Sequence, residues 1–281
     1  MWQSNYDGNP ILYLVPTPIG NMEDMTFRAI KVLKEVEVIF SEDTRVTKNL
    51  LNYFEINNKL ISLHDHNEDV VKDNVLEYLK SGKCVAIVTD RGTPIISDPG
   101  YKTVKYVTDK GFRVVGLPGA CAFVPALIMS GLAPQPFTFY GFLDSKVEKK
   151  RKELEKLKFI ENTIIFYEAP HRISKTMELI LEVFGDRDVS LSREISKRYE
   201  SVYRGKISNL LSTLDNIKGE FVVVVDGFKN SLDVNEELDV VEQVNFYVEN
   251  GMLTMEAIKM VAKERGIKKN DVYAEYHRGD K

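Results

Sequence analysis

Short apolar runs alternate with helix-like segments along the first 118 residues, and this rhythm constrains the fold more than any other feature. The predicted strands are residues 11–15, 36–40, 59–63, 84–89 and 113–117. Amphipathic segments and short connections separate them. Strands and helices that alternate in this way form a mostly parallel sheet with helices on both faces. The chain is therefore predicted to be an α/β protein.

The turn Leu117-Pro118-Gly119 interrupts this rhythm, and a second pattern follows. Because 281 residues suffice for two ordinary domains, we predict two α/β domains and a small helical tail. They span residues 1–118, 119–228 and 229–281. In the second domain we predict strands at 137–140, 163–167, 188–192 and 221–226, an antiparallel segment at 199–203, and a helix at 170–184. The tail sequence EAIKMVAKERGIKKNDVYAEY fits either a helix-turn-helix or a plain helical cap.

The composition, 43% hydrophobic and 28% charged, is that of a soluble globular protein. A net charge of −4 argues against a protein that coats nucleic acid, although locally basic segments such as 144–158 could meet phosphates. The start of the chain lacks the pattern of a signal peptide, and no apolar run approaches the roughly 20 residues that span a bilayer. We therefore expect a cytoplasmic protein with no membrane partner. Two cysteines are too few for a disulfide framework or a zinc cluster.

The loop that follows the fourth predicted strand, residues 90–100, is rich in residues that fix backbone shape. Gly92 and Gly100 permit backbone angles closed to other residues, whereas Pro94 and Pro99 stiffen the segments between them. Ligands of α/β sheets usually bind at the carboxyl ends of the strands, where this loop lies. We predict that it contacts a ligand. The alternative is a structural turn in which Asp98 caps the following helix.

Three other loops follow parallel strands of the first domain, at residues 16–21, 41–45 and 64–68. All four loops should therefore gather at one edge of the sheet. Their polar residues are too many for turn capping alone. They are Thr17, Asn21, Glu42, Asp43, Arg45, His64, His66, Glu68, Asp90 and Asp98.

Several enzyme classes are excluded by missing motifs. The chain has no GxxxxGK[ST], no GxGxxG after its first strand and no GxSxG, so a P-loop enzyme, an ordinary dinucleotide dehydrogenase and a serine hydrolase do not fit. His64 and His66 with Glu68 could ligate a metal, but no third obvious ligand accompanies the histidines. We predict no metal site and favour hydrogen-bonding roles for these residues.

A set of motifs closely resembles the family of ribosomal RNA small-subunit methyltransferase I, of the tetrapyrrole methylase-like superfamily. They are LYLVPTPIGNMEDMTFRAIKVLKEVEVIFSEDTR, VTDRGTPIISDPGY, LPGACAFVPALIMSGL, FYGFL, YEAPHR and SREISKRYESVYRG. The resemblance is continuous from Leu12 to Gly227 and looser in the tail. It implies two α/β domains with S-adenosylmethionine in the cleft between them. It also implies a homodimer that methylates the ribose 2'-hydroxyl of a cytidine in the decoding region of 16S rRNA. The expected substrate is the rRNA within the small ribosomal subunit.

The resemblance assigns cofactor contacts to particular positions. They are Pro16, Gly92, Thr93, Ile96, Cys121, Ala122, Tyr167, Glu168 and Phe221. The chain departs from the family pattern at two places. Arg91 stands where a small residue is more common, and the sequence ACA, centred on Cys121, replaces a more common PSA, which exchanges a hydroxyl for a thiol.

Methyl transfer to a ribose hydroxyl requires orientation of the reactants, together with a base or a cation near the attacking oxygen. The candidate catalytic residues are Glu42, Asp43, Glu194 and Lys197. We favour Lys197 and Glu194, for which the alternative is an exposed salt-bridged pair. The predicted substrate-binding residues are Arg45, His171, Arg172 and Arg193.

The motif YEAPHR places two cationic candidates, His171 and Arg172, at the start of a predicted helix. Cations there oppose the helix dipole unless they face an anion. An RNA phosphate could supply that anion, and the alternative is a pair between Arg172 and Glu168 or Glu178.

Two rival functions stay open at this point. One is methylation of a small tetrapyrrole. Three features argue against it: the SEDTR motif, the YEAPHR motif and the tail. The other is a non-catalytic RNA-binding or assembly module that has kept the cofactor pocket, with Arg91 as its distinguishing change.

Overall fold

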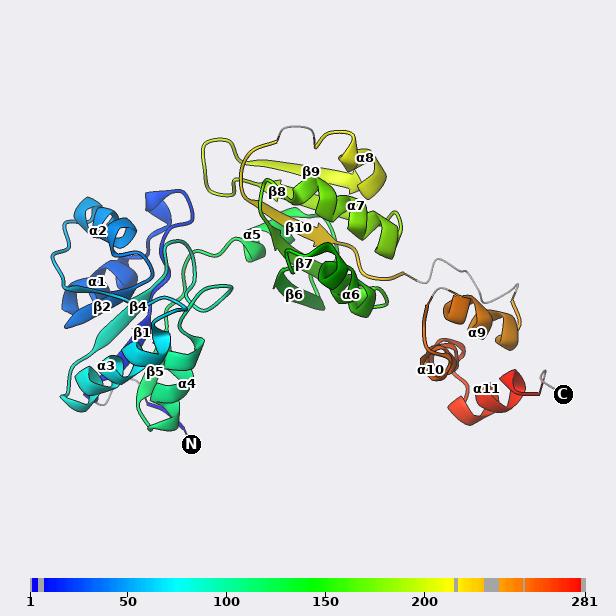
Figure 1. Cartoon of the computed structure of the whole chain (residues 1–281), viewed down its shortest axis with the longest axis horizontal. Helices are drawn as coiled ribbons and strands as arrows, with labels where there is room; N and C mark the ends of the chain where they lie inside the picture. Colours follow the sequence, from blue (N-terminus) through cyan, green and yellow to red (C-terminus); the bar gives the residue numbers. More distant parts are fainter. Residues whose placement is uncertain (1, 5–7, 215–216, 230–237, 250, 279–281) are drawn as a thin grey trace. The chain divides into compact units, whose positions relative to one another are not determined.

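The computed structural model describes residues 2–4, 8–214, 217–229, 238–249 and 251–278. The chain divides into two compact units, Met1–Phe228 and Lys229–Lys281 (Figure 1). The first unit contains two five-stranded sheets, and the second contains helices. The predicted α/β class with a helical tail is confirmed. Of the six acidic residues between Lys229 and Asn250, three lie in residues 230–237, outside the described residues.

The first sheet is entirely parallel, with strand order β3-β2-β4-β1-β5. Its strands are β1 Ile11–Leu14, β2 Val38–Ser41, β3 Leu60–Ser62, β4 Val85–Val88 and β5 Arg113–Gly116. Its helices are α1 Phe27–Glu35, α2 Thr44–Tyr53, α3 Glu68–Lys80 and α4 Tyr101–Asp109, and residues Met22–Asp24 form a short 3₁₀ helix. The strands fall where the sequence predicted them, within two residues at each end.

Helices cover both faces of this sheet, as the buried side chains show. Along β4, Val85 and Ile87 pack into a cluster with residues of α3 and α4, whereas Ala86 and Val88 pack into another with residues of α1 and α2. Successive side chains of a strand point to opposite faces, so a strand buried on both faces reads as a continuous apolar run. This explains the run VAIV.

The second sheet has strand order β6-β7-β10-β8-β9 and is mainly antiparallel. Its strands are β6 Phe137–Phe142, β7 Thr163–Glu168, β8 Asp188–Arg193, β9 Ser201–Lys206 and β10 Phe221–Val225. Among the described strands of this second sheet, only β6 and β7 pair in parallel. Strand β9 is antiparallel to β8, as predicted. Its helices are α5 Phe123–Met129, α6 Val147–Leu157, α7 Ile173–Phe184 and α8 Ile207–Leu211.

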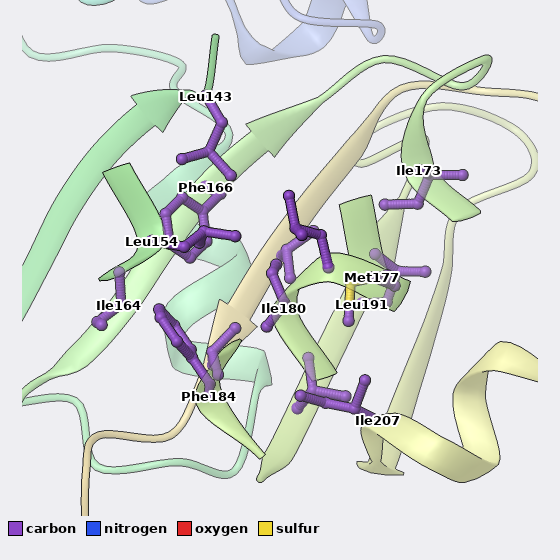
Figure 2. Packing of buried hydrophobic residues seen from close by; sticks show 14 of the residues in the cluster. Leu143, Leu154, Ile164, Phe166, Ile173, Met177, Ile180, Phe184, Leu191 and Ile207 are labelled. Carbon is purple, nitrogen blue, oxygen red and sulfur yellow. The ribbon is translucent and has the colours of Figure 1, made fainter. Parts of the chain in front are cut away.

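The two faces of the second sheet bury separate clusters. Side chains of α6, α7 and α8 pack on one face, where Phe166 and Met177 are fully buried (Figure 2). On the other face Val222 and Val224 of β10 pack with α5. Ile19, from the loop after β1, joins this second cluster, so the loops of one sheet contact the core of the other.

Helix α7 begins later than the sequence predicted. Residues 170–172 form a turn closed by a hydrogen bond from the Arg172 N–H to the Ala169 carbonyl, 3.0 Å, and the helix starts at Ile173. The prediction of Pro170 as the first helical turn is therefore wrong. The capping role considered for Asp98 is also wrong, because Gly100 is the N-cap residue of α4 and no side chain caps that helix.

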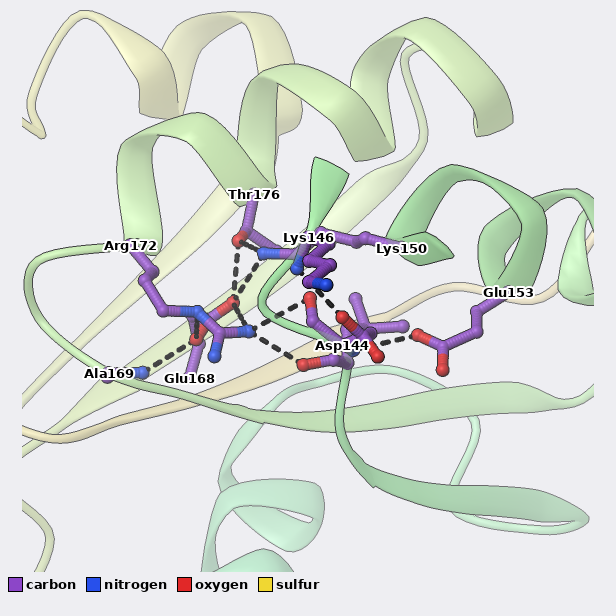
Figure 3. Close-up of polar contacts among 9 residues, drawn as sticks. Asp144, Lys146, Lys150, Glu153, Glu168, Ala169, Arg172 and Thr176 are labelled. Carbon is purple, nitrogen blue, oxygen red and sulfur yellow. Dashed lines mark hydrogen bonds and ion pairs between the residues drawn. The ribbon is translucent and has the colours of Figure 1, made fainter. Parts of the chain in front are cut away.

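A buried polar network joins α6, α7 and the end of β7 (Figure 3). Lys150 is 4% exposed and Glu168 is 2% exposed, and the Lys150 Nζ lies 3.1 Å from a Glu168 carboxylate oxygen. The Thr176 hydroxyl donates to the same oxygen at 2.6 Å, and the Arg172 guanidinium lies 3.0 Å from the other. The Ala169 N–H also donates to Glu168, at 2.8 Å. Several donors thus compensate the desolvation of one carboxylate.

The second unit consists of α9 Val240–Glu249, α10 Thr254–Arg265 and α11 Lys269–Tyr276. The fully buried Tyr247 donates a hydrogen bond to Glu264 at 2.7 Å and so ties α9 to α10. Gly266 ends α10 in the left-handed conformation, and residues 266–268 connect it to α11. A short turn with glycine between two helices matches the helix-turn-helix pattern. Within the described part of the chain no helix is long and apolar enough to cross a bilayer.

We expect Glu168→Gln to lower the free energy of unfolding by about 3 kcal/mol, because it leaves the Lys150 ammonium buried without a carboxylate. The double variant Lys150→Met/Glu168→Gln should recover part of that loss. Urea unfolding monitored by circular dichroism measures both. The exposed pair Lys105–Asp109 provides the control, since Asp109→Asn should cost about 1 kcal/mol or less. Equal losses for Glu168→Gln and Asp109→Asn would contradict the assignment.

Candidate active site

A cavity of about 400 Å³, here called pocket A, is lined by loops that follow strands of both sheets. The lining is mainly apolar, with a few polar groups at its edge. The residues are Ile19, Arg91, Gly92, Thr93, Ile96, Ser97, Asp98, Cys121, Ala122, Phe142, Tyr167, Glu168, Ala169, Pro170, Ile195, Glu220, Phe221 and Val222. A largely apolar concave site with a few convergent polar groups is the usual form of a small-molecule site.

Backbone hydrogen bonds hold the loop after β4 in place. Thr17 and Gly92 exchange two of them, at 2.9 and 3.0 Å, and the Thr93 hydroxyl donates to the Ala120 carbonyl at 3.0 Å. Gly92 has φ +83, and a Cβ there would lie 3.2 Å from the Ile19 side chain. Ser97 also has a positive φ, 67, although it carries a side chain. Strained backbone of this kind persists where surrounding contacts enforce it, and it is concentrated at functional sites.

All of the predicted cofactor residues except Pro16 line pocket A. Pro16 is buried instead, and a Cβ at Gly119 would lie 2.6 Å from its side chain. Pro16 therefore shapes the chain beside the pocket by packing against Gly119. The assignment of the lining residues as cofactor contacts stays a prediction.

Asp98 lines pocket A, although the sequence assigned it neither a cofactor contact nor a catalytic role. Burial, together with the nearby negative charge of Glu42, raises the pKa of Asp98 to about 6, although a hydrogen bond with Thr89 acts in the opposite direction. Burial also raises the pKa of Asp90, whose carboxylate accepts a hydrogen bond from the Asp43 N–H at 3.0 Å. The signal in the sequence was the second aspartate of the loop after β4. Helix capping was the alternative role that the sequence offered for it.

A second cavity of about 480 Å³, here called pocket B, lies beside the loop after β1, helix α2 and the loop after β8. Its lining is more polar than that of pocket A. The residues are Thr17, Pro18, Gly20, Met22, Val46, Thr47, Asn49, Leu50, Thr89, Asp90, Arg91, Glu194 and Lys197. Arg91 belongs to both pockets.

Ion pairs connect the linings of the two pockets. The Lys197 Nζ lies 2.9 Å from a Glu194 carboxylate oxygen and 2.7 Å from a Glu220 oxygen. The other Glu220 oxygen lies 2.7 Å from the Arg91 guanidinium. The backbone N–H of Glu220 donates to Glu194 and, with Lys197, lowers the pKa of that carboxyl. Lys197 and Glu194 thus form the ion pair of the alternative, but both side chains are only 20% exposed and both residues line pocket B. Their catalytic roles stay a prediction.

The other predicted catalytic residues lie outside the linings of both pockets. Glu42 accepts a hydrogen bond from the Thr89 hydroxyl at 2.9 Å. Asp43 caps α2 by accepting from the Arg45 N–H at 2.8 Å, and hydrogen bonds from Arg45 lower the pKa of Asp43 to about 2. A carboxylate with so low a pKa is a poor general base near neutral pH. The structure therefore gives Asp43 a capping role in place of the predicted catalytic one.

None of the predicted substrate-binding residues lines pocket A or pocket B. Arg45 has 89% of its side chain exposed and pairs with Asp43 at 2.6 Å. The Arg193 Nε donates to the Lys218 carbonyl at 2.5 Å, and His171 is exposed on the turn before α7. The anion that faces Arg172 is the Glu168 carboxylate of this chain, as the alternative held. Glu68 was the residue that could have joined His64 and His66 at a metal site. It is buried, and its carboxylate accepts a hydrogen bond from the Thr103 N–H at 2.8 Å.

Comparison with known proteins shows extensive similarity. The family model for Tetrapyrrole (Corrin/Porphyrin) Methylases matches residues 11–211. The chain is 50% identical over 275 residues to the ribosomal RNA small subunit methyltransferase I of Bacillus subtilis, covering 95% of this chain and 94% of that protein. It is 44% identical over 277 residues to the protein of that name from Halalkalibacterium halodurans, with 96% of each covered. For the Vibrio cholerae protein the identity is 40% over 272 residues, with 95% and 94% covered.

Solved structures with the same fold are more distant in sequence. Uroporphyrin-III C-methyltransferase from Thermus thermophilus, complexed with S-adenyl homocysteine, matches with a TM-score of 0.55 and 17% identity over 76% of this chain and 96% of that chain. Cobalt precorrin-4 methyltransferase matches with a TM-score of 0.57 and 17% identity over 77% and 94%. At such identities the likeness establishes the fold alone.

The raised pKa of Asp98 predicts a specific pH dependence of stability. The folded state holds the Asp98 proton up to about pH 6, whereas the ordinary value is 3.8. Between these values the unfolded chain binds fewer protons, so this residue makes stability fall as pH rises. Asp98→Asn should therefore raise the melting temperature at about pH 7.5 more than at about pH 4. Differential scanning calorimetry of both proteins provides the measurement, and an equal shift at the two pH values would disprove the assignment.

Proposed function

Because this chain belongs to the ribosomal RNA small subunit methyltransferase I family of tetrapyrrole methylases, we propose that it methylates the ribose 2'-oxygen of a cytidine in the decoding region of 16S rRNA. The methyl donor is S-adenosylmethionine. The observation that carries the proposal is pocket A, because residues that the family motifs assign to the cofactor converge on one cavity. We also propose a cytoplasmic homodimer that acts on rRNA within the small ribosomal subunit.

Pocket A fits S-adenosylmethionine in size and chemistry. Its volume of about 400 Å³ lies within the roughly 300–1,000 Å³ of sites for small molecules. Ile96, Phe221 and Val222 offer apolar surface to the adenosine and methionine carbons. Gly92 lets the ligand approach the backbone. These residues would hold the cofactor.

When bound, S-adenosylmethionine supplies a methyl group on a sulfonium centre, which is already a good leaving group. The protein must therefore chiefly orient the acceptor oxygen. Orientation of this kind can contribute about 7–11 kcal/mol to lowering a barrier. The loop after β4 suits the task, because the Thr17–Gly92 and Thr93–Ala120 hydrogen bonds prevent it from shifting.

The acceptor hydroxyl must also lose its proton. Asp98 is the best candidate for the base among the carboxylates near pocket A, since a pKa of about 6 lies near the operating pH. Lys197 is the candidate that stabilises negative charge on the oxygen, because its ammonium is held at the boundary of the pockets by Glu194 and Glu220.

Asp98→Asn should lower kcat about 100-fold and change the dissociation constant of S-adenosylmethionine much less. The acid limb of the wild-type pH–rate profile, near pH 6, should disappear in this variant. Single-turnover methylation with labelled cofactor gives the rate, and calorimetry gives the cofactor affinity. Since the variant is expected to be more stable at neutral pH, unfolding would not explain a loss of activity. Retention of the acid limb would exclude Asp98 as the base.

The function itself is tested by mapping 2'-O-methylation in 16S rRNA from cells with and without this protein. Labelled cofactor is then supplied to the purified protein with unmodified small subunits, naked 16S rRNA or a porphyrinoid. We expect a cytidine 2'-O-methyl group that depends on the protein. Transfer to the porphyrinoid alone would favour a tetrapyrrole enzyme, and cofactor binding without any transfer would favour an assembly module.

A further inference from the structure

Pocket B adjoins pocket A through charged side chains. Arg91 lines both cavities, and Glu220 of pocket A contacts Lys197 of pocket B at 2.7 Å. Ion pairs among Arg91, Glu220 and Lys197 connect the two linings. Ion pairs between partly exposed groups are worth little and exchange readily with other ligands. A group bound in pocket B can therefore approach a ligand in pocket A.

The loop that supplies Lys197 is held in a strained shape. Glu194 and Ser196 have positive φ values of 52 and 67, which are unusual for residues with side chains. A Cβ at Gly20 would lie 2.3 Å from the Lys197 side chain, so only glycine permits this approach. The Ser196 hydroxyl also hydrogen-bonds to Asp24. These contacts fix Lys197 at the edge of pocket B.

A polar group beside pocket B has no hydrogen-bond partner in the described part of the chain. Thr47 of α2 is 2% exposed, lines pocket B, and its hydroxyl has no hydrogen-bond partner among the described residues. A buried hydroxyl without a partner lowers stability, and most buried polar side chains avoid that state. A ligand in pocket B that accepts or donates a hydrogen bond would satisfy it.

The charges of pocket B select the class of ligand. Two cations, Arg91 and Lys197, face two carboxylates, Asp90 and Glu194, so the lining is formally neutral. Neutral surroundings disfavour a ligand with several negative charges but accept a single phosphodiester beside the arginine. Val46 adds apolar surface for the face of a base. These properties fit one nucleotide and disfavour a polycarboxylate macrocycle.

We propose that pocket B binds the acceptor nucleotide, withdrawn from the RNA as a single unit, with its ribose toward the Arg91–Glu220–Lys197 boundary. This inference rests on the proposed function and adds the place where the substrate binds. Thr47 contacts the nucleotide, and Arg91 pairs with its phosphate. Extrusion of a single nucleotide is a common way for enzymes to reach a target inside folded nucleic acid.

The test blocks pocket B without touching pocket A. Val46 is 41% exposed at the rim of pocket B, and Lys48 is exposed on the same helix but does not line it. We expect Val46→Trp to lower kcat/KM for RNA methylation about 100-fold, with the affinity for S-adenosylmethionine unchanged. Lys48→Trp is the matched control and should keep wild-type kinetics. Equal activity of the two variants would overturn the proposal.

A second pair of variants shows whether misfolding could explain a loss of activity. Thr47→Val removes the unpartnered hydroxyl, so it should keep or raise the melting temperature and yet lower kcat/KM about 10-fold. Thr47→Ser keeps a hydroxyl and should retain activity. A fully active Thr47→Val protein would contradict the proposed contact.

Failure of the proposed function is recognised separately, because the wild type would then transfer no methyl group to any RNA. In that case binding of a short cytidine-containing RNA to the Val46→Trp and Lys48→Trp proteins decides the inference. Weaker binding to Val46→Trp alone supports pocket B as a nucleotide site, and equal binding refutes it.

Discussion

The parallel pairing of β1 with β4 determines where both cavities lie. Parallel neighbours end at the same edge of a sheet, so the loops that follow these strands meet there. Thr17 and Gly92 then join the two loops by a pair of backbone hydrogen bonds. Residues on either side of this junction line pocket A or pocket B. A change that separated these loops would therefore disturb both sites at once.

Much of the fold could be predicted from the sequence because it depends on local patterns. The run VAIV of β4 and the alternation of strands and helices identify a parallel sheet covered on both faces. The second sheet was harder, because its antiparallel order comes from pairings between distant segments such as β7 and β10. The start of α7 was misplaced for a local reason, since the turn at residues 170–172 looks like a first helical turn in the sequence.

For the site, the sequence predicted some classes of residue better than others. Cofactor positions carried by family motifs converge on pocket A, with Pro16 as the exception. The charged residues were predicted less well than the cofactor positions, because a charged residue on a loop can equally cap a helix or form an ion pair within the protein. Asp43 caps a helix, and Arg172 pairs with the buried Glu168. The sequence placed Asp98 in the loop after β4 but gave no sign of its raised pKa, and it gave no signal for Thr47, because burial and missing partners are properties of the folded chain.

The carboxylate of Glu220 touches two cations with its two oxygens, Arg91 on one side and Lys197 on the other. A ligand that draws either cation away alters the charge balance felt by the other. Occupation of one cavity then changes the affinity of the other, and thermodynamic linkage requires the same factor in both directions. The affinities for methyl donor and acceptor would thus be coupled through a single bridging anion.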